Sequence, residues 1–426
     1  MSMLELKQNN HPAETAVPAG YRKIREATLA LCEPLELEDY GLQAMPEVSP
    51  PKWHLAHSSW FFETFILLPF ADGYRPFHPA CEYLFNSYYH GVGAQYPRAQ
   101  RGLLSRPTVR EVRGYRTHVD AAMIGLLAQP DHPQRDSILS RCELGLQHEQ
   151  QHQELLCTDI KYSFSFNPLY PALGRAPPAA QPAGSRPLDF TEFATMDAVI
   201  GTGGSRFHFD NEAPAHRYHL PAFRLANRLV TNAEYLAFME EGGYTSPGLW
   251  LADGWLWKEA GNAAHPRYWV QRDGDWFEYT LYGLRPLDPG LPVSHVNYYE
   301  ADACARWFGR RLPTEQEWEA ACGQLQLVPE HADIALHPRA AVDSDGPVQM
   351  FGSLWQWTRS GYAPYPGYRP AAGAIGEYNG KFMCNQYVLR GSSCVTPPGH
   401  ARTTYRNFFY PGDQWQFTGI RLADDP

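Results

Sequence analysis

The sequence predicts an α+β protein of two domains, in which a four-helix bundle precedes an α+β domain with much irregular structure. Three observations support this prediction. At 426 residues the chain is long enough to bury two substantial cores. Its first part repeats apolar residues at helical spacing in four segments, whereas its last part has short β-like runs between frequent glycine and proline turns. A stretch with six prolines, from Pro168 to Pro187, separates the two parts.

The expected domain boundaries follow these changes in composition. Residues 1–17 are polar without periodicity and are predicted to be a loose N-terminal tail. Residues 18–165 are expected to form the helical bundle, and residues 166–188 a proline-rich, semi-rigid linker. Residues 189–426 form the second domain, where two helices are expected near residues 232–241 and 299–309.

The first two bundle helices are expected at residues 21–32 and 53–68. The second repeats apolar groups at Trp53, Ala56, Trp60 and Leu67, which places His54, His57 and Phe61 near one another on one face.

Thr108 is a plausible N-cap of a third helix that runs to about residue 128, with Pro107 near its first turn. A fourth helix follows Asp131 and His132 and extends to about residue 161. Its apolar positions are Ile138, Cys142, Leu146, Leu155 and Leu156. Four amphipathic helices form a bundle, in which inward-facing side chains commonly build metal sites.

The composition excludes several classes of function. Apolar residues make up 44% of the chain, but no apolar run approaches the roughly 20 residues of a bilayer span, and the N-terminus lacks a signal-peptide pattern. The net charge of -10 is spread without a basic stripe, which argues against nucleic acid or an acidic membrane surface as partner. Eight scattered cysteines are expected to be reduced thiols. We therefore expect a cytoplasmic protein that acts on small molecules, with no indication of its oligomeric state.

The strongest local signal is the pair His148 and His152 in the fourth helix. Histidines at positions i and i+4 lie one turn apart on one helix face, so both imidazoles can reach one ion. Glu149 fits the zinc-protease form of this motif, but no obvious third ligand follows downstream. A third histidine from the second helix, either His54 or His57, would complete a site for Zn(II) or Fe(II) with open coordination positions.

The first long loop, residues 70–106, carries further candidates for chemistry. Tyr88 and Tyr89 are phenols that can donate a proton or an electron near a metal site. Arg98 and Arg101 can hold a carboxylate in a bidentate fork. Loops fixed by a rigid bundle often carry such groups, although paired tyrosines and arginines are frequently structural.

A series of segments along the second domain carries a family resemblance. Residues 309–319, 352–358, 389–394 and 419–422 resemble the formylglycine-generating-enzyme (sulfatase-modifying factor) domain, a fold related to C-type lectins, and the N-terminal part resembles the DinB-like helical bundle. Together with residues 378–386, this domain pair resembles the sulfoxide synthases of ergothioneine biosynthesis from about residue 18 to 424.

The resemblance implies a non-haem Fe(II)- and O2-dependent enzyme that joins the sulfur of a thiol to the imidazole ring of hercynine (Nα-trimethylhistidine). It implies that His57, His148 and His152 hold the iron, which leaves His54 a supporting role. It also implies that Gln151 and Asn407 contact hercynine.

The thiol donor follows from the same resemblance. Phe408 and Phe409 stand where the γ-glutamylcysteine-using relatives carry Trp-Asp, which favours cysteine. Tyr88 and Tyr89 then correspond to tyrosines that supply a proton or an electron, and Arg98 and Arg101 to residues at the thiol donor's carboxylate. For the quaternary ammonium of hercynine, which cannot donate a hydrogen bond, Phe408, Phe409 and Trp415 are the candidates.

Two alternatives stay open at this point. Relatives with the same domains attach selenium from a selenosugar to hercynine, and nothing in the sequence excludes that donor. A zinc-dependent DinB-like thiol transferase uses the same three-histidine bundle but does not need the second domain. A copper-dependent formylglycine-generating oxidase is disfavoured because it needs a close cysteine pair, whereas Cys384 and Cys394 are ten positions apart.

Overall fold

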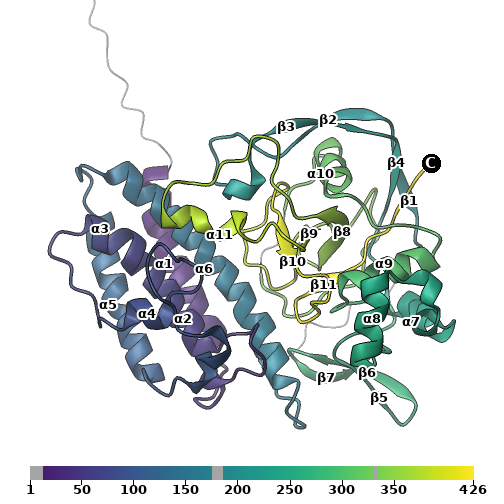
Figure 1. Ribbon diagram of the computed structural model, residues 1–426, viewed down its shortest axis with the longest axis horizontal. Helices are drawn as coiled ribbons and strands as arrows, with labels where there is room; N and C mark the ends of the chain where they lie inside the picture. Colours follow the sequence, from purple (N-terminus) through teal and green to yellow (C-terminus); the bar gives the residue numbers. More distant parts are fainter. Residues whose placement is uncertain (1–12, 175–185, 330–332) are drawn as a thin grey trace, which may run out of the picture. The chain divides into compact units, whose positions relative to one another are not determined.

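The computed structural model describes residues 13–174, 186–329 and 333–426 (Figure 1). The chain divides into two compact units, Met1–Gln153 and Glu154–Pro426, and the division falls inside helix α6 (Arg135–Phe164). Parts of the predicted tail and linker, residues 1–12 and 175–185, lie outside the described residues. The domain boundaries drawn from composition therefore stay predictions.

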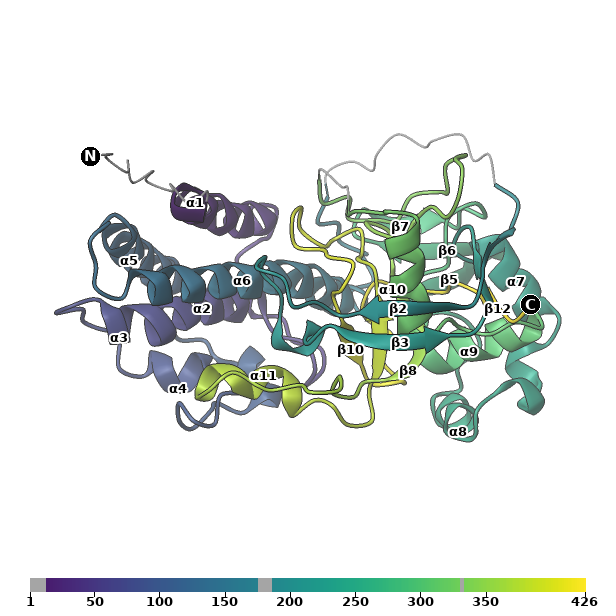
Figure 2. The same ribbon diagram turned by 90° about the horizontal axis from the view of Figure 1, so that it is seen from above.

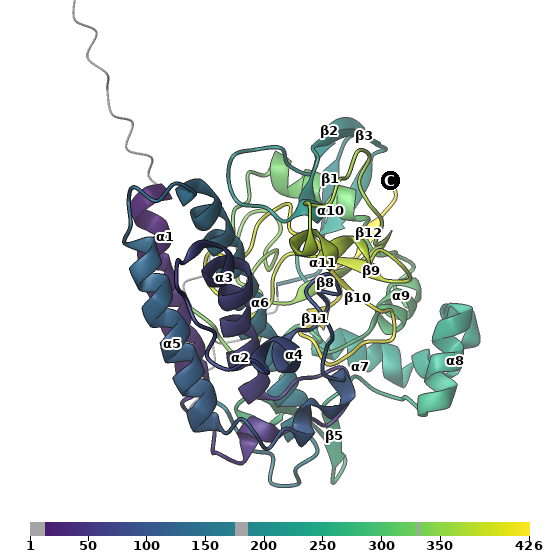
Figure 3. The ribbon, with the colours of Figure 1, turned by 60° about the vertical axis from the view of Figure 1, so that its left-hand side comes forward.

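The first unit is built around four long helices (Figure 3). They are α1 (Ala13–Cys32), α2 (Pro51–Phe62), α5 (Val109–Leu127) and the first part of α6. Shorter elements connect them: η1 (Asp39–Gly41), the π-helix η2 (Glu63–Leu67), α3 (Leu68–Phe70), α4 (Cys81–Phe85) and η3 (Arg98–Leu103). The predicted helical bundle is confirmed.

Helix α1 begins earlier than the sequence pattern indicated. It starts at Ala13, so residues 13–17, which were predicted to belong to the loose tail, are helical. Ala13, Glu14 and Ala16 have high intrinsic helix propensity, which explains why the helix extends before the first periodic apolar position at Tyr21.

Helix α2 is not amphipathic, and the prediction of an amphipathic second helix was wrong. All twelve of its residues are buried, because α5, α4 and η1 all pack against it. Pro51 occupies the start of the helix, where its missing N–H is not needed. The helix continues through η2 into α3, so its end agrees with the predicted position near residue 68.

The start of α5 agrees with the predicted cap. The Thr108 hydroxyl accepts a hydrogen bond from the backbone N–H of Glu111, and the Glu111 carboxylate accepts one in return from the Thr108 N–H. This capping box satisfies two donors that the helix itself leaves unpaired.

The second unit contains four small sheets and several short helices. Its sheets are β1 (Phe190–Phe193), β4 (Phe223–Ala226) and β12 (Ala423–Asp424); β2 (Met196–Ile200) and β3 (His216–Leu220); β5 (Trp269–Arg272), β6 (Asp275–Thr280) and β7 (Gly283–Pro286); and β10 (Asn407–Phe409), β9 (Tyr387–Arg390), β8 (Trp355–Gly361) and β11 (Thr418–Gly419), in these orders. All paired strands are antiparallel except β8 and β11. This mixture confirms the predicted α+β class.

The second unit also contains short helices. They are α7 (Asn232–Glu240), α8 (Ala252–Gly261), α9 (Tyr298–Trp307), α10 (Glu315–Gln324) and α11 (Glu377–Gly380), together with the 3-10 turns η4 (Asp210–Glu212), η5 (Gly243–Thr245), η6 (Pro247–Leu249) and η7 (Ala374–Gly376). The two helices predicted near residues 232–241 and 299–309 are α7 and α9. Helix α10 lies beside the β2–β3 ribbon (Figure 2), and Trp318 of α10 packs in the core with Phe223 and Leu225.

Buried ion pairs join the segments that carried the family resemblance. Arg390 of β9 pairs with Glu319 of α10, and both side chains are buried. Arg406 pairs with Glu315 through its Nε at 2.8 Å. Each pair satisfies charges that would be costly to bury alone. In the described part of the chain, no helix is long and apolar enough to cross a membrane.

Candidate metal centre

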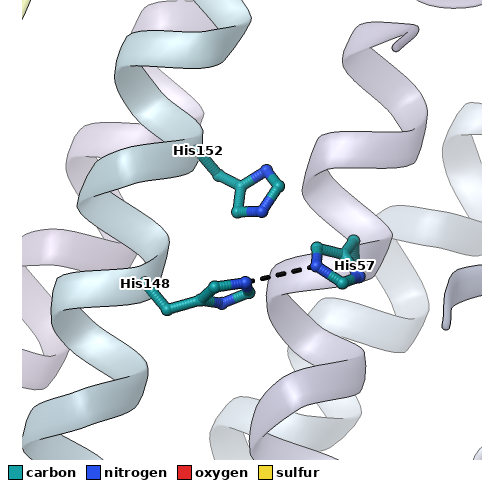
Figure 4. Close-up of side chains that lie close together, drawn as sticks. All are labelled: His57, His148 and His152. Atoms are coloured by element: carbon teal, nitrogen blue, oxygen red, sulfur yellow. Dashed lines mark hydrogen bonds between the residues drawn. The ribbon is translucent and has the colours of Figure 1, made fainter. Parts of the chain in front are cut away.

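Three histidine side chains meet inside the first unit. His57 extends from α2, and His148 and His152 extend from α6 one turn apart (Figure 4). The candidate ligand atoms of the three rings lie within 4.8 Å of one another, and all three side chains are buried. The Nε2 atoms of His57 and His148 are 3.2 Å apart. The structure therefore brings together the three histidines that the resemblance singled out.

Two of the three rings are oriented by partners at their outer nitrogens. His57 Nδ1 lies 2.5 Å from the backbone oxygen of Phe85, at the end of α4. Because a carbonyl oxygen only accepts, His57 carries its proton on Nδ1, and its Nε2 presents a lone pair to the cluster. His152 Nδ1 lies 2.9 Å from Nδ1 of His54. Partners of this kind orient metal-binding imidazoles and fix their tautomers.

Burial keeps the three imidazoles neutral. It lowers the pKa of His148 to about 4, and the neighbouring Glu149 carboxylate does not offset this effect. Burial, followed by the nearby His148 ring, lowers the pKa of both His57 and His152 well below the ordinary value. Neutral imidazole is the form that binds metal ions.

The spacing of the nitrogens fits a single bound ion. Imidazole nitrogens bind metals such as zinc at about 2.0–2.1 Å, so two nitrogens on one ion are roughly 3 Å apart when they subtend about a right angle. The 3.2 Å between the two Nε2 atoms matches this spacing. Three neutral nitrogen ligands suit Fe(II) or Zn(II) and leave positions for further ligands.

Glu149 does not serve the cluster as a general base. Its carboxylate accepts hydrogen bonds from Arg25 at 2.9 Å and from Thr28 at 2.6 Å, and it is also paired with Arg116. Burial alone would raise its pKa, but Arg116 and Arg25 outweigh that effect and lower the pKa to about 2. A carboxylate held this way cannot take up a proton near neutral pH, which argues against the zinc-protease mechanism.

Aromatic rings enclose the ligands. Trp53 stacks on His57 with centroids 4.4 Å apart and an interplanar angle of 14°. Trp60 stacks on the same imidazole at 5.3 Å and 13°, and Phe61 stacks on His148 at 4.6 Å. These contacts hold the rings in place and exclude water from the site.

The two candidate tyrosines differ in their surroundings. Tyr89 is buried, and its ring lies 5.6 Å from Trp60 and 5.0 Å from Phe65. Tyr88 is half-buried, and its hydroxyl accepts a hydrogen bond from Arg98. Both follow Phe85, whose carbonyl orients His57, so the loop that carries the tyrosines also supports a candidate metal ligand.

The predicted substrate-binding residues lie in three places, the first of which is η3 with Arg98 and Arg101. Gln151 is half-buried on α6, between the two histidines of that helix. The other four belong to the second unit: Asn407, Phe408 and Phe409 form β10, and the buried Trp415 contacts Phe409 with ring centroids 5.7 Å apart. Their predicted contacts with substrate stay predictions.

Sequence reasoning missed the groups that support the ligands. The Phe85 carbonyl gave no signal, because a backbone oxygen leaves no mark in a sequence. Arg25 and Arg116 lie on two other helices, and only the tertiary structure brings them to Glu149. Trp53 was recognised as an apolar position, and its i, i+4 spacing from His57 could have predicted the stacking.

Comparisons with known proteins match both units. The model of the DinB superfamily matches residues 21–156, and that of the sulfatase-modifying factor enzyme 1-like domain matches residues 190–331 and 338–426. A hercynine oxygenase of Mycolicibacterium thermoresistibile is 31% identical over 448 aligned residues, which cover 96% of each chain. One of Mycobacterium tuberculosis is 32% identical over 434 aligned residues, which cover 95% of this chain and 97% of the relative. A formylglycine-generating enzyme of Streptomyces coelicolor is 28% identical over 60% of this chain and 95% of its own length.

Proposed function

Because this chain belongs to the hercynine oxygenases, the sulfoxide synthases of ergothioneine biosynthesis, we propose that it joins the sulfur of cysteine to the imidazole ring of hercynine, using Fe(II) and O2. Family membership makes it an oxygen-using oxidoreductase that acts on small molecules. The observation that carries the finer proposal is the buried cluster of three neutral imidazoles in a chain that aligns with these relatives along 94–96% of its length.

The proposed reaction balances without a further oxidant. A ring C–H bond and a thiol S–H bond are replaced by one C–S bond, and the sulfur is oxidised to the sulfoxide. One atom of O2 enters the sulfoxide, and the other leaves as water with the two hydrogens. Bound to His57, His148 and His152, iron would supply the one-electron chemistry that lets O2 react and would favour the thiolate form of the sulfur donor.

The protein's own residues would orient the substrates and exclude water. The stacked Trp53 and Trp60 keep the His57 imidazole fixed and dry. We propose that Tyr88 or Tyr89 delivers a proton or an electron, which directs the reaction towards the C–S bond and away from oxidation of the thiol alone. Arg98 is exposed and carries a planar fork suited to the carboxylate of cysteine. Arg101 has a different environment, because its side chain is buried.

We propose that hercynine is recognised by Gln151 and Asn407 and by aromatic rings for its trimethylammonium group. Phe408 stacks on Tyr362 with centroids 4.2 Å apart and lies 5.9 Å from the Phe382 ring. Clustered rings of this kind attract a quaternary ammonium through cation–π interaction. Phe409 and Trp415 are the further candidates for this contact.

The choice of donor is tested by product analysis. Protein loaded anaerobically with Fe(II) is supplied with O2, with hercynine or histidine, and with cysteine, γ-glutamylcysteine or a selenosugar. Mass spectrometry should detect the sulfoxide of the hercynine–cysteine conjugate as the main product. A selenium product, a preference for γ-glutamylcysteine, or activity with zinc in the absence of O2 would contradict the proposal.

A further inference from the structure

The segment of residues 85–89, here called the tyrosine segment, is tied directly to a candidate metal ligand. Its first residue, Phe85, accepts the hydrogen bond from His57 Nδ1. The side chain of Asn86 braces the turn: its Nδ2 donates to the backbone oxygen of Tyr89 at 3.0 Å, and its Oδ1 accepts from the Tyr89 N–H at 3.2 Å. The position of both tyrosines therefore depends on how this segment is held against α2.

Arg101 joins the tyrosine segment to the start of α2. Its side chain is buried, although it comes from the short helix η3 in a surface loop. Nη2 donates to the Ser87 hydroxyl at 2.9 Å, and Nη1 donates to the Ser49 hydroxyl at 2.9 Å. Ser87 belongs to the tyrosine segment, and Ser49 lies two residues before the first residue of α2. The planar fork of one guanidinium thus fixes the distance between the two elements.

The same guanidinium continues the stack on the metal ligand. It lies 3.5 Å from the centroid of the Trp53 ring, and the other partner of Trp53 in this stack is the nearly parallel imidazole of His57. Cation–π contacts are strongest where water is excluded. Arg101 therefore contacts α2 through the face of Trp53, and its hydrogen bond to Ser49 holds the residues that lead into this helix.

Arg98, on the same short helix, has the opposite environment. Its side chain is exposed, and it donates to the Tyr88 hydroxyl and to the backbone oxygen of Glu47. A carboxylate arriving from solvent can reach this guanidinium by replacing exposed hydrogen bonds, whereas at Arg101 it would have to replace two buried hydrogen bonds beside the face of Trp53.

We propose that Arg101 is a positioning residue that locks the tyrosine segment against His57, and that Arg98 alone of the two arginines holds the carboxylate of the thiol substrate. The expected kinetic effects rest on the proposed function, whereas the structural role of Arg101 in holding the tyrosine segment does not. It replaces the expectation that the two arginines share one role.

The locking is tested without activity by hydrogen exchange of the metal-free protein. Arg101→Met keeps an apolar chain over Trp53 but removes both hydrogen bonds to serine. The hydrogen-bonded amides of Tyr89 and His90 should then exchange at least about tenfold faster, while amides within α5 keep their protection. Arg98→Met is the matched control and should change exchange much less, because its contacts are exposed to water. Unchanged exchange in Arg101→Met would overturn the proposal.

A second variant covers the case in which Arg101→Met does not fold. Ser87→Ala removes only the hydrogen bond between Arg101 and the tyrosine segment and leaves the stack on Trp53 in place. It should raise exchange at Tyr89 and His90 in the same direction, whereas Ser49→Ala should have a smaller effect there. Equal effects of the two serine variants would contradict a specific link between Arg101 and the tyrosine segment.

Kinetics separates positioning from substrate binding. Arg101→Met should lower kcat for sulfoxide formation at least about tenfold, change the KM for cysteine little, and raise the share of cysteine sulfinate. Arg98→Met should mainly raise the KM for cysteine. If Arg101→Met raises that KM about tenfold and leaves kcat and product ratio unchanged, Arg101 is a carboxylate ligand and the proposal fails. If the unaltered protein forms no C–S product, the proposed function fails, and the exchange experiment still decides the role of Arg101.

Discussion

Replacing Glu149 by glutamine should destabilise the first unit strongly. The carboxylate is fully buried and is shared by Arg25, Arg116 and Thr28, which extend from α1 and α5. Glu149→Gln keeps the shape of the side chain but removes its charge. Two buried guanidinium groups then remain with Asp120 as their anion, and Asp120 is bonded to Arg25. Leaving a buried charge without its partner typically costs about 3–5 kcal/mol.

The lowered pKa of Glu149, which results from the same ion pairs, corresponds to a similar magnitude. Although burial opposes ionisation, Arg116 and Arg25 lower this pKa from 4.5 to about 2. A change of this size corresponds to a factor of roughly 300 in the ionisation equilibrium, or about 3 kcal/mol of stability above pH 5. Because the pKa is lower in the folded state, this contribution is complete above about pH 4.5 and is lost as the pH falls towards 2.

Urea unfolding of the metal-free protein measures the effect. Circular dichroism at 222 nm reports mainly on helices and therefore on the first unit. Asp120→Asn is the matched control: this side chain is 26% exposed and also pairs with Arg25, so its loss should cost only about 1 kcal/mol. Below pH 3 the difference between Glu149→Gln and the unaltered protein should shrink. A loss no larger than that of Asp120→Asn at pH 7 would refute the reasoning.

His54→Gln should weaken metal binding about 10–100-fold, because His54 only orients a ligand. His57→Gln should abolish stoichiometric binding. Equilibrium dialysis with Co(II) measures both effects, and equal losses of affinity in the two variants would contradict this assignment. Of the separate variants Tyr88→Phe and Tyr89→Phe, at least one should shift the products from sulfoxide to cysteine sulfinate, and an unchanged ratio in both would remove the proposed proton or electron donor. Thr314→Ala should destabilise the second unit by about 1 kcal/mol in urea, since its hydroxyl caps α10, and no change would show that the cap contributes nothing.

The bundle could be predicted because its helices carry local signals. Apolar spacing marked the first, second and fourth helices, and Pro107 with Thr108 marked the start of α5. Helix α10 escaped prediction although Thr314 and Glu317 form the same kind of capping box, so that signal was available in the sequence. Helix α8 has no side-chain cap at its start, which left no comparable mark.

The choice between His54 and His57 could not be made from spacing. Both are buried on α2, and they are three positions apart, so both can approach the pair on α6. Their different environments come from contacts made by residues distant in sequence. The Phe85 carbonyl, 28 residues away, leaves His57 Nε2 facing the cluster, whereas His54 contacts His152 at its outer nitrogen.

The roles of Arg98 and Arg101 were likewise inseparable in the sequence. Both belong to one loop, and both are suited to a carboxylate. Burial distinguishes them, since Arg101 is 3% exposed and Arg98 is an exposed side chain. That difference depends on serines 52 and 14 residues away, which only the folded chain brings together.

We propose that His57, His148 and His152 hold one metal ion that allows O2 to convert hercynine and cysteine into a sulfoxide. The most direct test is a single turnover of Fe(II)-loaded protein with both substrates and isotopically labelled O2, followed by mass spectrometry. The unaltered protein should bind one iron per chain and form a conjugate whose sulfoxide oxygen carries the label, and an alanine variant at any of the three histidines should do neither. A labelled conjugate formed by such a variant at an undiminished rate, or an unlabelled sulfoxide from the unaltered protein, would contradict the account.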